Sequence, residues 1–357
     1  MPAKKNLTVY LLIFFVSFAV LTGSSYNTYL SYERFYNPDS ETYTNTAKFH
    51  FKDQSLIRKY RVIVPTLANI ASLPLEKIYY KIVKDHRDKY DWPLLTGFFI
   101  VNALLMSLAA VVIFKIMRFQ GLGLPASVIG LAAFLTGGRW ASFLTGHPAT
   151  DSLTILCIAL IVYSMLKPNR FLLAAGIVIG LLSKESTALF FPMIMILLPG
   201  KQRWWALVYM VVAFALYFGL KAWIDALSGT TPVASINEGL DTFNSVKDSL
   251  LKLFSVKGIA DMFSVYGFFN LFLLTGLFSK TFRENIWSYL GPLFWLFLLT
   301  IIAHMLLSME LARMFYLGSA LFIPLIAKSF ELHPLVIKMK KENYDQQELP
   351  AGHLNNP

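Results

Sequence analysis

The chain has 357 residues, of which 56% are apolar and 15% are charged, and its formal net charge is +11. An ordinary soluble domain has roughly 45–50% apolar and about 25% charged residues, so this composition predicts a chain surrounded by lipid. The basic residues lie between apolar runs and form no single stripe, which argues against nucleic acid as a partner. The one cysteine, Cys157, lies inside an apolar run, which excludes a disulfide framework and a cysteine-based metal site.

The first apolar run, residues 7–22, follows Lys4 and Lys5 and could be read as a secretory signal. A signal core is typically about 7–15 residues long and ends at small residues. This run is longer, and the bulky Tyr26 and Tyr29 follow it. We therefore expect a retained first helix.

Stretches of about 20 apolar residues predict membrane-spanning helices. The sequence predicts an all-α, polytopic transmembrane helix bundle of about ten spans. The spans 171–183 and 187–199 are so short that we expect them to form a hairpin buried among other helices. The ten predicted spans are 7–23, 94–114, 122–138, 152–166, 171–183, 187–199, 204–223, 262–278, 286–307 and 314–327.

The positions of the basic residues predict the orientation of these spans. With a cytoplasmic N-terminus, alternating spans place fourteen basic residues in cytoplasmic segments, and only Arg139, Lys184 and Arg313 in short outer loops. Cytoplasmic loops of membrane proteins carry such an excess of lysine and arginine. Both chain termini are therefore predicted to be cytoplasmic.

Two long outer loops are expected, 24–93 and 224–261. The apolar stretch 60–75 in the first loop would reverse every later helix if it crossed the membrane. Because Pro65 and Pro74 interrupt helical hydrogen bonding, we expect this stretch to lie in the interface or to enter the membrane only in part.

The second loop contains apolar residues at helical spacing, which predict a surface amphipathic helix. These residues are Leu240, Phe243, Val246, Leu250, Leu251 and Phe254. The polar segment 331–357 is expected to be a cytoplasmic tail, disordered from Glu342 onward.

Candidate catalytic residues begin just after the first helix. Asp39 and Glu41 lie near the predicted membrane surface, where a carboxylate can act as a general base. The same residues also suit a turn or a helix N-cap. Arg58 and Arg61 would share one helical face and could hold a phosphate, or they could reach toward lipid headgroups.

Three short outer turns add further ionisable residues. Arg139, His147 and Asp151 share one connection, in which Asp151 could equally cap the next helix. A metal site built on His147 and Asp151 would need more ligands than this connection offers. Charges at membrane depth are usually functional, which draws attention to the other two turns. They contain Lys184 with Glu185, and Glu310 with Arg313 at i, i+3.

These five clusters all fall on one predicted face. A bundle that only had to sit in lipid would have no reason to concentrate acidic, basic and histidine side chains there. The sequence therefore predicts a site on the extracytoplasmic side.

The arrangement resembles the integral-membrane glycosyltransferases of the GT-C fold class. NPDSETY, residues 37–43, looks like the acidic motif of their long first outer loop, with Asp39 the better match and Glu41 the second. The stretches YRVIVPTLA, TGHPATDS and SKES look like features of the smaller bacterial members. The resemblance covers roughly residues 7–327 in layout, and it implies one transmembrane domain over 1–330. Unlike the larger members, this sequence is expected to have no soluble C-terminal domain and fewer helices.

The resemblance implies sugar transfer, with inversion, from a polyprenyl-phosphate donor at the outer face of a bacterial inner membrane. Asp39 would act as base, with Glu41 as the second candidate. The cations Arg58, Arg61, Lys184, Arg313 and Arg139 would stabilise the leaving phosphate. Sugar or acceptor would be positioned by His147, Asp151, Glu185 and Glu310. No metal and no cofactor would be required, and membrane lipids would be the other partners.

Three other functions fit the residues, and one of them is a different outer-face reaction of a lipid-linked substrate, such as polymerisation or ligation. A flippase or transporter of a lipid-linked or anionic substrate would place ionisable groups near the bilayer midplane. A non-catalytic membrane scaffold would scatter them. The sequence leaves the sugar, the acceptor and the oligomeric state open.

Overall fold

The computed structural model describes residues 2–31, 38–52, 54, 57–82, 90–229, 246–308 and 310–339. These residues form helices joined by short connections, and no strand occurs among them, which confirms the all-α prediction. The first part contains α1 (Pro2–Leu30), α2 (Pro38–Ala47), η1 (Arg58–Tyr60), α3 (Ile63–Ile82), α4 (Trp92–Phe119), α5 (Leu124–Thr136), α6 (Arg139–Gly146), α7 (Asp151–Leu166), α8 (Arg170–Ser183), η2 (Glu185–Phe190) and α9 (Phe191–Leu197). The second contains α10 (Gly200–Ser228), α12 (Val256–Tyr266), η4 (Gly267–Phe269), α13 (Asn270–Gly276), α14 (Lys280–Tyr289), α15 (Pro292–Ser308), α16 (Leu311–Leu317) and α17 (Ser319–Glu331).

The apolar segments are helical as predicted, but their number as membrane spans is lower. Four helical stretches are long and apolar enough to cross a membrane: Leu7–Leu30, Trp92–Phe119, Gly200–Ser228 and Val256–Gly276. The bent pairs α5 with α6, α14 with α15, and α16 with α17 raise this number to seven if each is one span. The expectation of about ten spans is therefore wrong. The remaining apolar segments form α7, α8 and the pair η2 and α9, which are too short to span.

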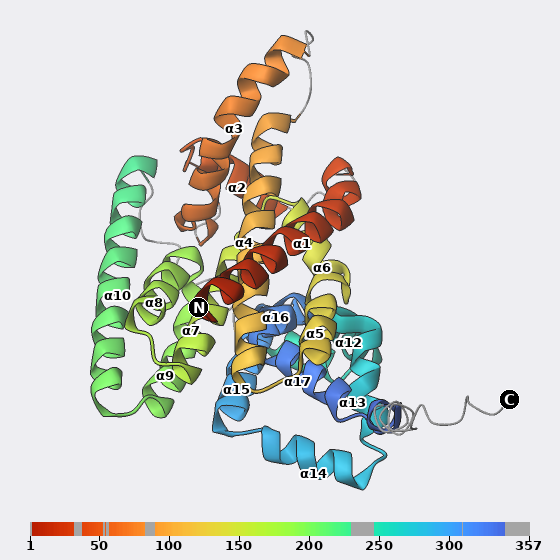
Figure 1. Cartoon of the computed structure of the whole chain (residues 1–357). Coiled ribbons are helices and arrows are strands. Elements are labelled where there is room, and N and C mark those ends of the chain that lie inside the picture. Colours follow the sequence, from red (N-terminus) through yellow and green to blue (C-terminus); the bar gives the residue numbers. More distant parts are fainter. Residues whose placement is uncertain are drawn as a thin grey trace, which may run out of the picture.

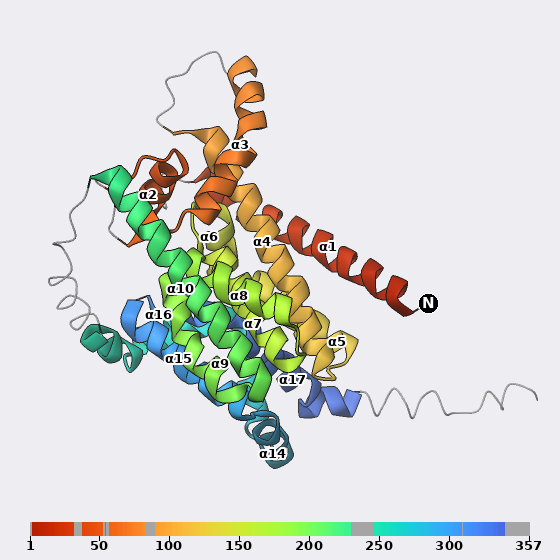
Figure 2. The ribbon, with the colours of Figure 1, turned by 90° about the vertical axis from the view of Figure 1, so that its left-hand side faces the viewer.

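The helices pack around α4 and α7 at the centre of the molecule (Figure 1). The largest cluster of buried apolar side chains includes Met106 of α4, Ile158 of α7 and Ile323 of α17. Helices α8, α9 and α10 cover one side of α7, as the green segments of Figure 1 show. Helix α1 crosses α4 on the outside and projects from the bundle in Figure 2. Only 11% of its apolar window is buried, as expected of a helix that lipid surrounds.

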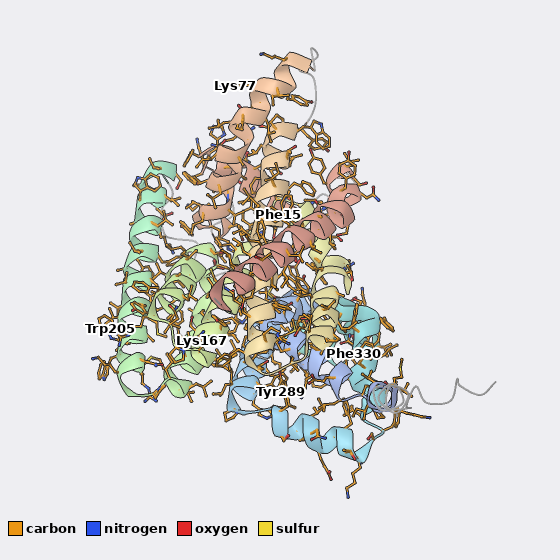
Figure 3. All side chains as sticks on the ribbon, viewed as in Figure 1. Phe15, Lys77, Lys167, Trp205, Tyr289 and Phe330 are labelled. Atoms are coloured by element: carbon orange, nitrogen blue, oxygen red, sulfur yellow. The ribbon has the colours of Figure 1, made fainter. Side chains whose placement is uncertain are left out.

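The two ends of the bundle carry different residues. Lys167, which follows α7, and Trp205 near the start of α10 lie toward the lower end, whereas Lys77 of α3 lies at the top (Figure 3). The upper end also contains α2 and the start of α4 (Figures 1 and 2). The turn after α7 and the first predicted outer loop thus lie toward opposite ends, while the direction of the bundle in a membrane stays a prediction.

Segment 60–75 lies mostly in α3. We expected Pro65 and Pro74 to interrupt helical hydrogen bonding there, but the helix is continuous. Pro65 is in the first turn, where a proline costs no helical hydrogen bond, and the helix continues through Pro74. Packing against α4 compensates for the bond lost at Pro74. The two helices approach so closely at Gly97 that a Cβ atom there would lie 2.2 Å from the Ala68 carbonyl oxygen. Helix α3 does not qualify as a membrane span by length and composition.

The second long loop is shorter than predicted. Helix α10 continues to Ser228 and α12 begins at Val256, so both ends of 224–261 are helical. Residues 240–245 of the predicted amphipathic segment lie outside the described residues, whereas Leu251 and Phe254 are exposed. The tail from residue 340 onward is also outside the described part of the chain.

Candidate active site

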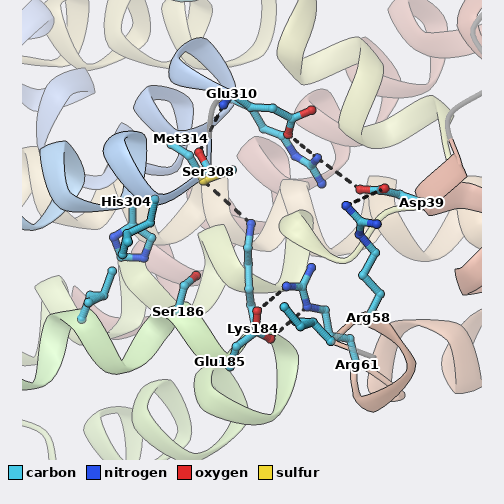
Figure 4. A pocket seen from close by; sticks show the side chains of 14 residues that line it. Asp39, Arg58, Arg61, Lys184, Glu185, Ser186, His304, Ser308, Glu310 and Met314 are labelled. Carbon is cyan, nitrogen blue, oxygen red and sulfur yellow. Dashed lines mark hydrogen bonds and ion pairs between the residues drawn. The ribbon is translucent and has the colours of Figure 1, made fainter. Parts of the chain in front are cut away.

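A cavity of about 520 Å³ lies where residues of α2, η1, η2 and α16 meet (Figure 4). Its size is in the range of small-molecule sites, which is roughly 300–1,000 Å³. Four cations and three carboxylates contribute to its lining. These residues are Arg58, Arg61, Lys184, Arg313, Asp39, Glu185 and Glu310, all of them candidates from the sequence.

Asp151 lies beneath the charged residues that line the cavity and contacts two of them. It is the first residue of α7 and is fully buried. One carboxylate oxygen accepts a hydrogen bond from Lys184 Nζ at 2.8 Å, and the other is paired with the Arg313 guanidinium. Lys184 is 6% exposed and Arg313 5% exposed. A buried charge is tolerated only when it is paired, so Asp151 is what permits two cations to lie beneath the cavity.

Asp39 reaches the same cavity from α2. Its carboxylate is 2.9 Å from an Arg58 nitrogen and 3.7 Å from an Arg313 nitrogen. The residue lies in the first turn of α2, as the N-terminal turn chemistry of Asn37-Pro38-Asp39 predicts. The side chain of Asp39 is 13% exposed, so a ligand in the cavity can reach its carboxylate.

Arg61 forms the opposite part of the wall. Its guanidinium pairs with Glu185 and donates a hydrogen bond to the Tyr43 hydroxyl at 3.0 Å. Burial alone would lower the pKa of Arg61, but Tyr43 and Glu185 outweigh burial and raise this pKa above its usual range. Arg61 is therefore a permanent cation. Tyr43 was not among the sequence candidates, although it follows Asp39 by one helical turn.

Lys184 has one weak hydrogen-bond partner, and Arg313 has one buried donor without a partner among the described residues. Besides Asp151, Lys184 Nζ contacts the Met314 sulfur at 3.9 Å, and a thioether is a weak acceptor. The buried Nε of Arg313 has no hydrogen-bond partner among the described residues. An anionic oxygen in the cavity would be a stronger partner for both cations.

Helix α10 fixes the short helix η1, which carries Arg58. Lys59 is fully buried and pairs with Asp225 at 2.9 Å. The Tyr60 hydroxyl donates a hydrogen bond to the same carboxylate at 2.6 Å. Adjacent residues of η1 thus point in different directions, so that two of them attach to α10 while Arg58 and Arg61 line the cavity. Asp225 could not be recognised from local sequence patterns, because it lies 165 residues from Tyr60.

Among the other sequence candidates, Glu310 lies at the edge of the cavity, whereas Glu41 and Arg139 do not line it. Glu310 lies at the rim, 45% exposed, and pairs with Arg313 at 2.6 Å, as the i, i+3 spacing predicts. Glu41 is exposed on α2 and does not line the cavity. Arg139 is exposed on α6, where its guanidinium carbon lies 5.0 Å from the Trp140 ring centroid. The structure therefore does not bring Glu41 or Arg139 into the charged cluster.

His147 lies in the α6 to α7 connection and does not line the cavity. It is 1% exposed, and its carbonyl oxygen accepts a hydrogen bond from Asn102 of α4 at 3.0 Å. The Ser40 hydroxyl donates to the carbonyl of the next residue, Pro148. This connection therefore holds α2 against α4 and α7. His147 contributes to this packing and not to the lining of the cavity.

Burial lowers the pKa of His147 to about 4. An unfolded histidine has a pKa of about 6.5, so the unfolded chain binds a proton that the folded chain does not. We expect this residue to remove about 3 kcal/mol of stability as the pH falls from about 6.5 to 4. Thermal unfolding in detergent across this pH range should show a shallower loss for His147→Gln than for the unchanged protein. Equal slopes would contradict the assignment.

Among the described residues, no group of three or more His, Cys, Asp and Glu side chains is placed to hold a metal ion. Metal-independent chemistry stays a prediction.

Comparisons with protein-family models, with curated proteins and with solved structures give no match to this chain. The fold and the geometry of the cavity are therefore the basis for a functional assignment.

Proposed function

We propose that the protein is a membrane glycosyltransferase of the GT-C type that uses a polyprenyl-phosphate sugar as donor. One observation carries this proposal: two buried cations, Lys184 and Arg313, face a cavity and are held there by the fully buried Asp151. A donor of this class releases a lipid phosphate. Fixed cations stabilise the negative charge that develops on such a leaving group, and they do so best where water is scarce.

Asp39 supplies the base in this proposal. The acceptor hydroxyl oxygen attacks the anomeric carbon, and the bond from that carbon to the phosphate oxygen breaks. The phosphate leaves with the electron pair, while the hydroxyl proton moves to the Asp39 carboxylate. Attack from the face opposite the phosphate inverts the anomeric carbon. Glu185 and Glu310, on two sides of the cavity, can accept hydrogen bonds from sugar or acceptor hydroxyls.

The site would face the extracytoplasmic side of a bacterial inner membrane. The cavity lies where α7 and α16 begin and α8 and α15 end, the helix ends opposite Lys167. The excess of basic residues at the other end of the bundle supports a cytoplasmic location for that end, with both chain termini. Labelling of Lys167 and Lys77 in intact cells would test this orientation, and only Lys77 should react from outside.

Sugar transfer can be tested directly. The purified protein in lipid nanodiscs is expected to move radiolabel from polyprenyl-phosphate sugars to glycolipid or glycan acceptors, with release of polyprenyl phosphate. A flippase would instead move the intact lipid between leaflets of a vesicle, and a scaffold would do neither. Leaflet movement without transfer would replace the proposal by the transporter function.

Substitution of Arg58 is expected to affect donor binding more than substitution of Arg139. Arg58 lines the cavity and pairs with Asp39, whereas Arg139 lies outside it. Arg58→Gln is expected to raise the KM for the donor about tenfold, because it removes a charge-assisted contact to phosphate. Arg139→Gln, the matched control, should change this KM by less than about twofold. Equal effects of the two variants would mean that general surface charge attracts the donor.

A further inference from the structure

A second cavity lies between α1, α3 and α4, and we call it the apolar groove. Its volume is about 470 Å³, and it shares no lining residue with the charged cavity. Leu30 of α1 and Ile78 of α3 line it and are 51% and 56% exposed. The groove is therefore open to a ligand, and the proposed sugar transfer gives it no role.

The lining of the apolar groove favours a ligand without polar groups. No described residue that lines it is charged. The rings of Tyr29 and Trp92 meet edge to face, with 5.7 Å between their centroids. The Tyr29 hydroxyl lies 2.6 Å from the Thr96 hydroxyl, so these two polar groups already satisfy each other. A site with apolar walls and paired polar groups gains most from burying a hydrocarbon chain.

The position of the groove relative to the apolar helices indicates where this hydrocarbon comes from. The candidate membrane span Leu7–Leu30 ends at the groove, and the candidate span Trp92–Phe119 begins there. The ends of such spans lie at the border between the bilayer core and the headgroups, where tryptophan and tyrosine side chains concentrate. The groove therefore lies at the depth at which a lipid acyl chain joins its headgroup.

Helix α3 provides positive charge beside the groove. It rises above the ends of α1 and α4 in Figures 1 and 2. Lys77 and Lys81 are exposed on this helix. They are spaced i, i+4 and so share one face, and Lys81 follows the groove residue Ile78 by about one turn. Lysines at this level of a membrane attract the phosphate of a lipid headgroup.

The described carboxylates nearby do not cancel this charge. Glu76 of α3 accepts a hydrogen bond from the Ser72 hydroxyl at 3.4 Å. Asp91, which caps the start of α4, pairs with Lys48 at 2.6 Å. Three lysines thus stand against two carboxylates around the groove. A local excess of positive charge favours an anionic headgroup over a zwitterionic one.

We propose that the apolar groove binds an acyl chain of an anionic phospholipid, whose headgroup is held by Lys77 and Lys81. The hydrocarbon lining, the depth of the groove and the two lysines each match one part of such a lipid. This inference does not depend on sugar transfer. It assigns the groove to a lipid of the surrounding membrane, bound beside the helices that carry the charged cavity.

The fluorescence of Trp92 reports directly on the groove, because this residue lines it. The full-length protein is placed in phosphatidylcholine nanodiscs that contain a rising fraction of phosphatidylglycerol with brominated acyl chains, which quench tryptophan on contact. The difference from Trp92→Phe protein isolates the Trp92 signal. Half of this signal should be lost at a fraction about fivefold lower than with brominated phosphatidylcholine.

Lys77→Gln with Lys81→Gln should remove this difference between the two lipids. The matched control is Lys201→Gln with Lys280→Gln, which removes two exposed lysines from the start of α10 and the start of α14. This control should keep the difference. Equal quenching by both lipids in the unchanged protein would overturn the inference, and so would a difference that survives the loss of Lys77 and Lys81. If neither lipid quenched Trp92, the groove would hold no acyl chain.

Discussion

Asparagine in place of Asp39 is expected to lower the rate constant for sugar transfer by about 100- to 10,000-fold, the usual contribution of a general base. The change keeps the size of the side chain and removes its charge. Asparagine can still accept from the acceptor hydroxyl, but it cannot take up the proton. The KM for the donor should change much less than kcat, because Arg61, Lys184 and Arg313 remain in place.

Glu41→Gln is the matched control. It removes a carboxylate from the same short helix, two residues away, at an exposed position outside the cavity. Transfer should stay within about twofold of the unchanged protein. If Glu41→Gln abolished transfer and Asp39→Asn did not, the two carboxylates would exchange roles. Thermal unfolding of both variants should match the unchanged protein, because neither side chain lies in the apolar core.

Local sequence patterns predicted the helices of this protein better than they predicted its spans. Hydropathy measures apolar content along the chain and does not show whether a short apolar helix crosses lipid or packs inside protein. The segments that became α7 and α8 have the same composition in either case. Pro74 shows the same limit, because contacts with α4 stabilise a helix that the sequence alone would interrupt.

The candidate site was partly predictable because its residues are costly to place in an apolar environment. Asp39, Arg61, Lys184 and Arg313 were all selected from the sequence as ionisable groups in outer loops, and the structure brings them to one cavity. Their pairing was not predictable. Asp151 lies 33 residues from Lys184 and 162 from Arg313, so no local spacing connects them.

The neutral side chains of the cavity were harder to recognise. A histidine within an apolar span is most often a packing residue, and nothing in the sequence around His304 indicates otherwise. Tyr43 and Ser186 carry no composition signal at all. Their relevance depends on which face of a helix meets the cavity, and that is decided by tertiary packing.

Removal of the buried carboxylate at Asp151 is expected to have the largest effect on stability. Asp151→Ala leaves Lys184 and Arg313 buried without their common partner, and breaking such a pair costs roughly 3–5 kcal/mol. Thermal or denaturant unfolding in detergent would measure this loss. Glu284→Gln is the control, because it breaks an exposed pair with Lys280 at 3.9 Å, where solvent already screens the charges.

A triple replacement separates stability from function. Asp151→Leu with Lys184→Met and Arg313→Met removes all three charges together, and buried ionic triads replaced by apolar residues can be as stable as the original. We expect this variant to unfold near the temperature of the unchanged protein and yet to lose donor binding and transfer. If it instead kept both, the buried charges would serve only to fix the fold, and the phosphate site would have to lie at Arg58 and Arg61. If the single Asp151→Ala variant were as stable as the unchanged protein, Asp151 could not be the residue that keeps two cations under the cavity.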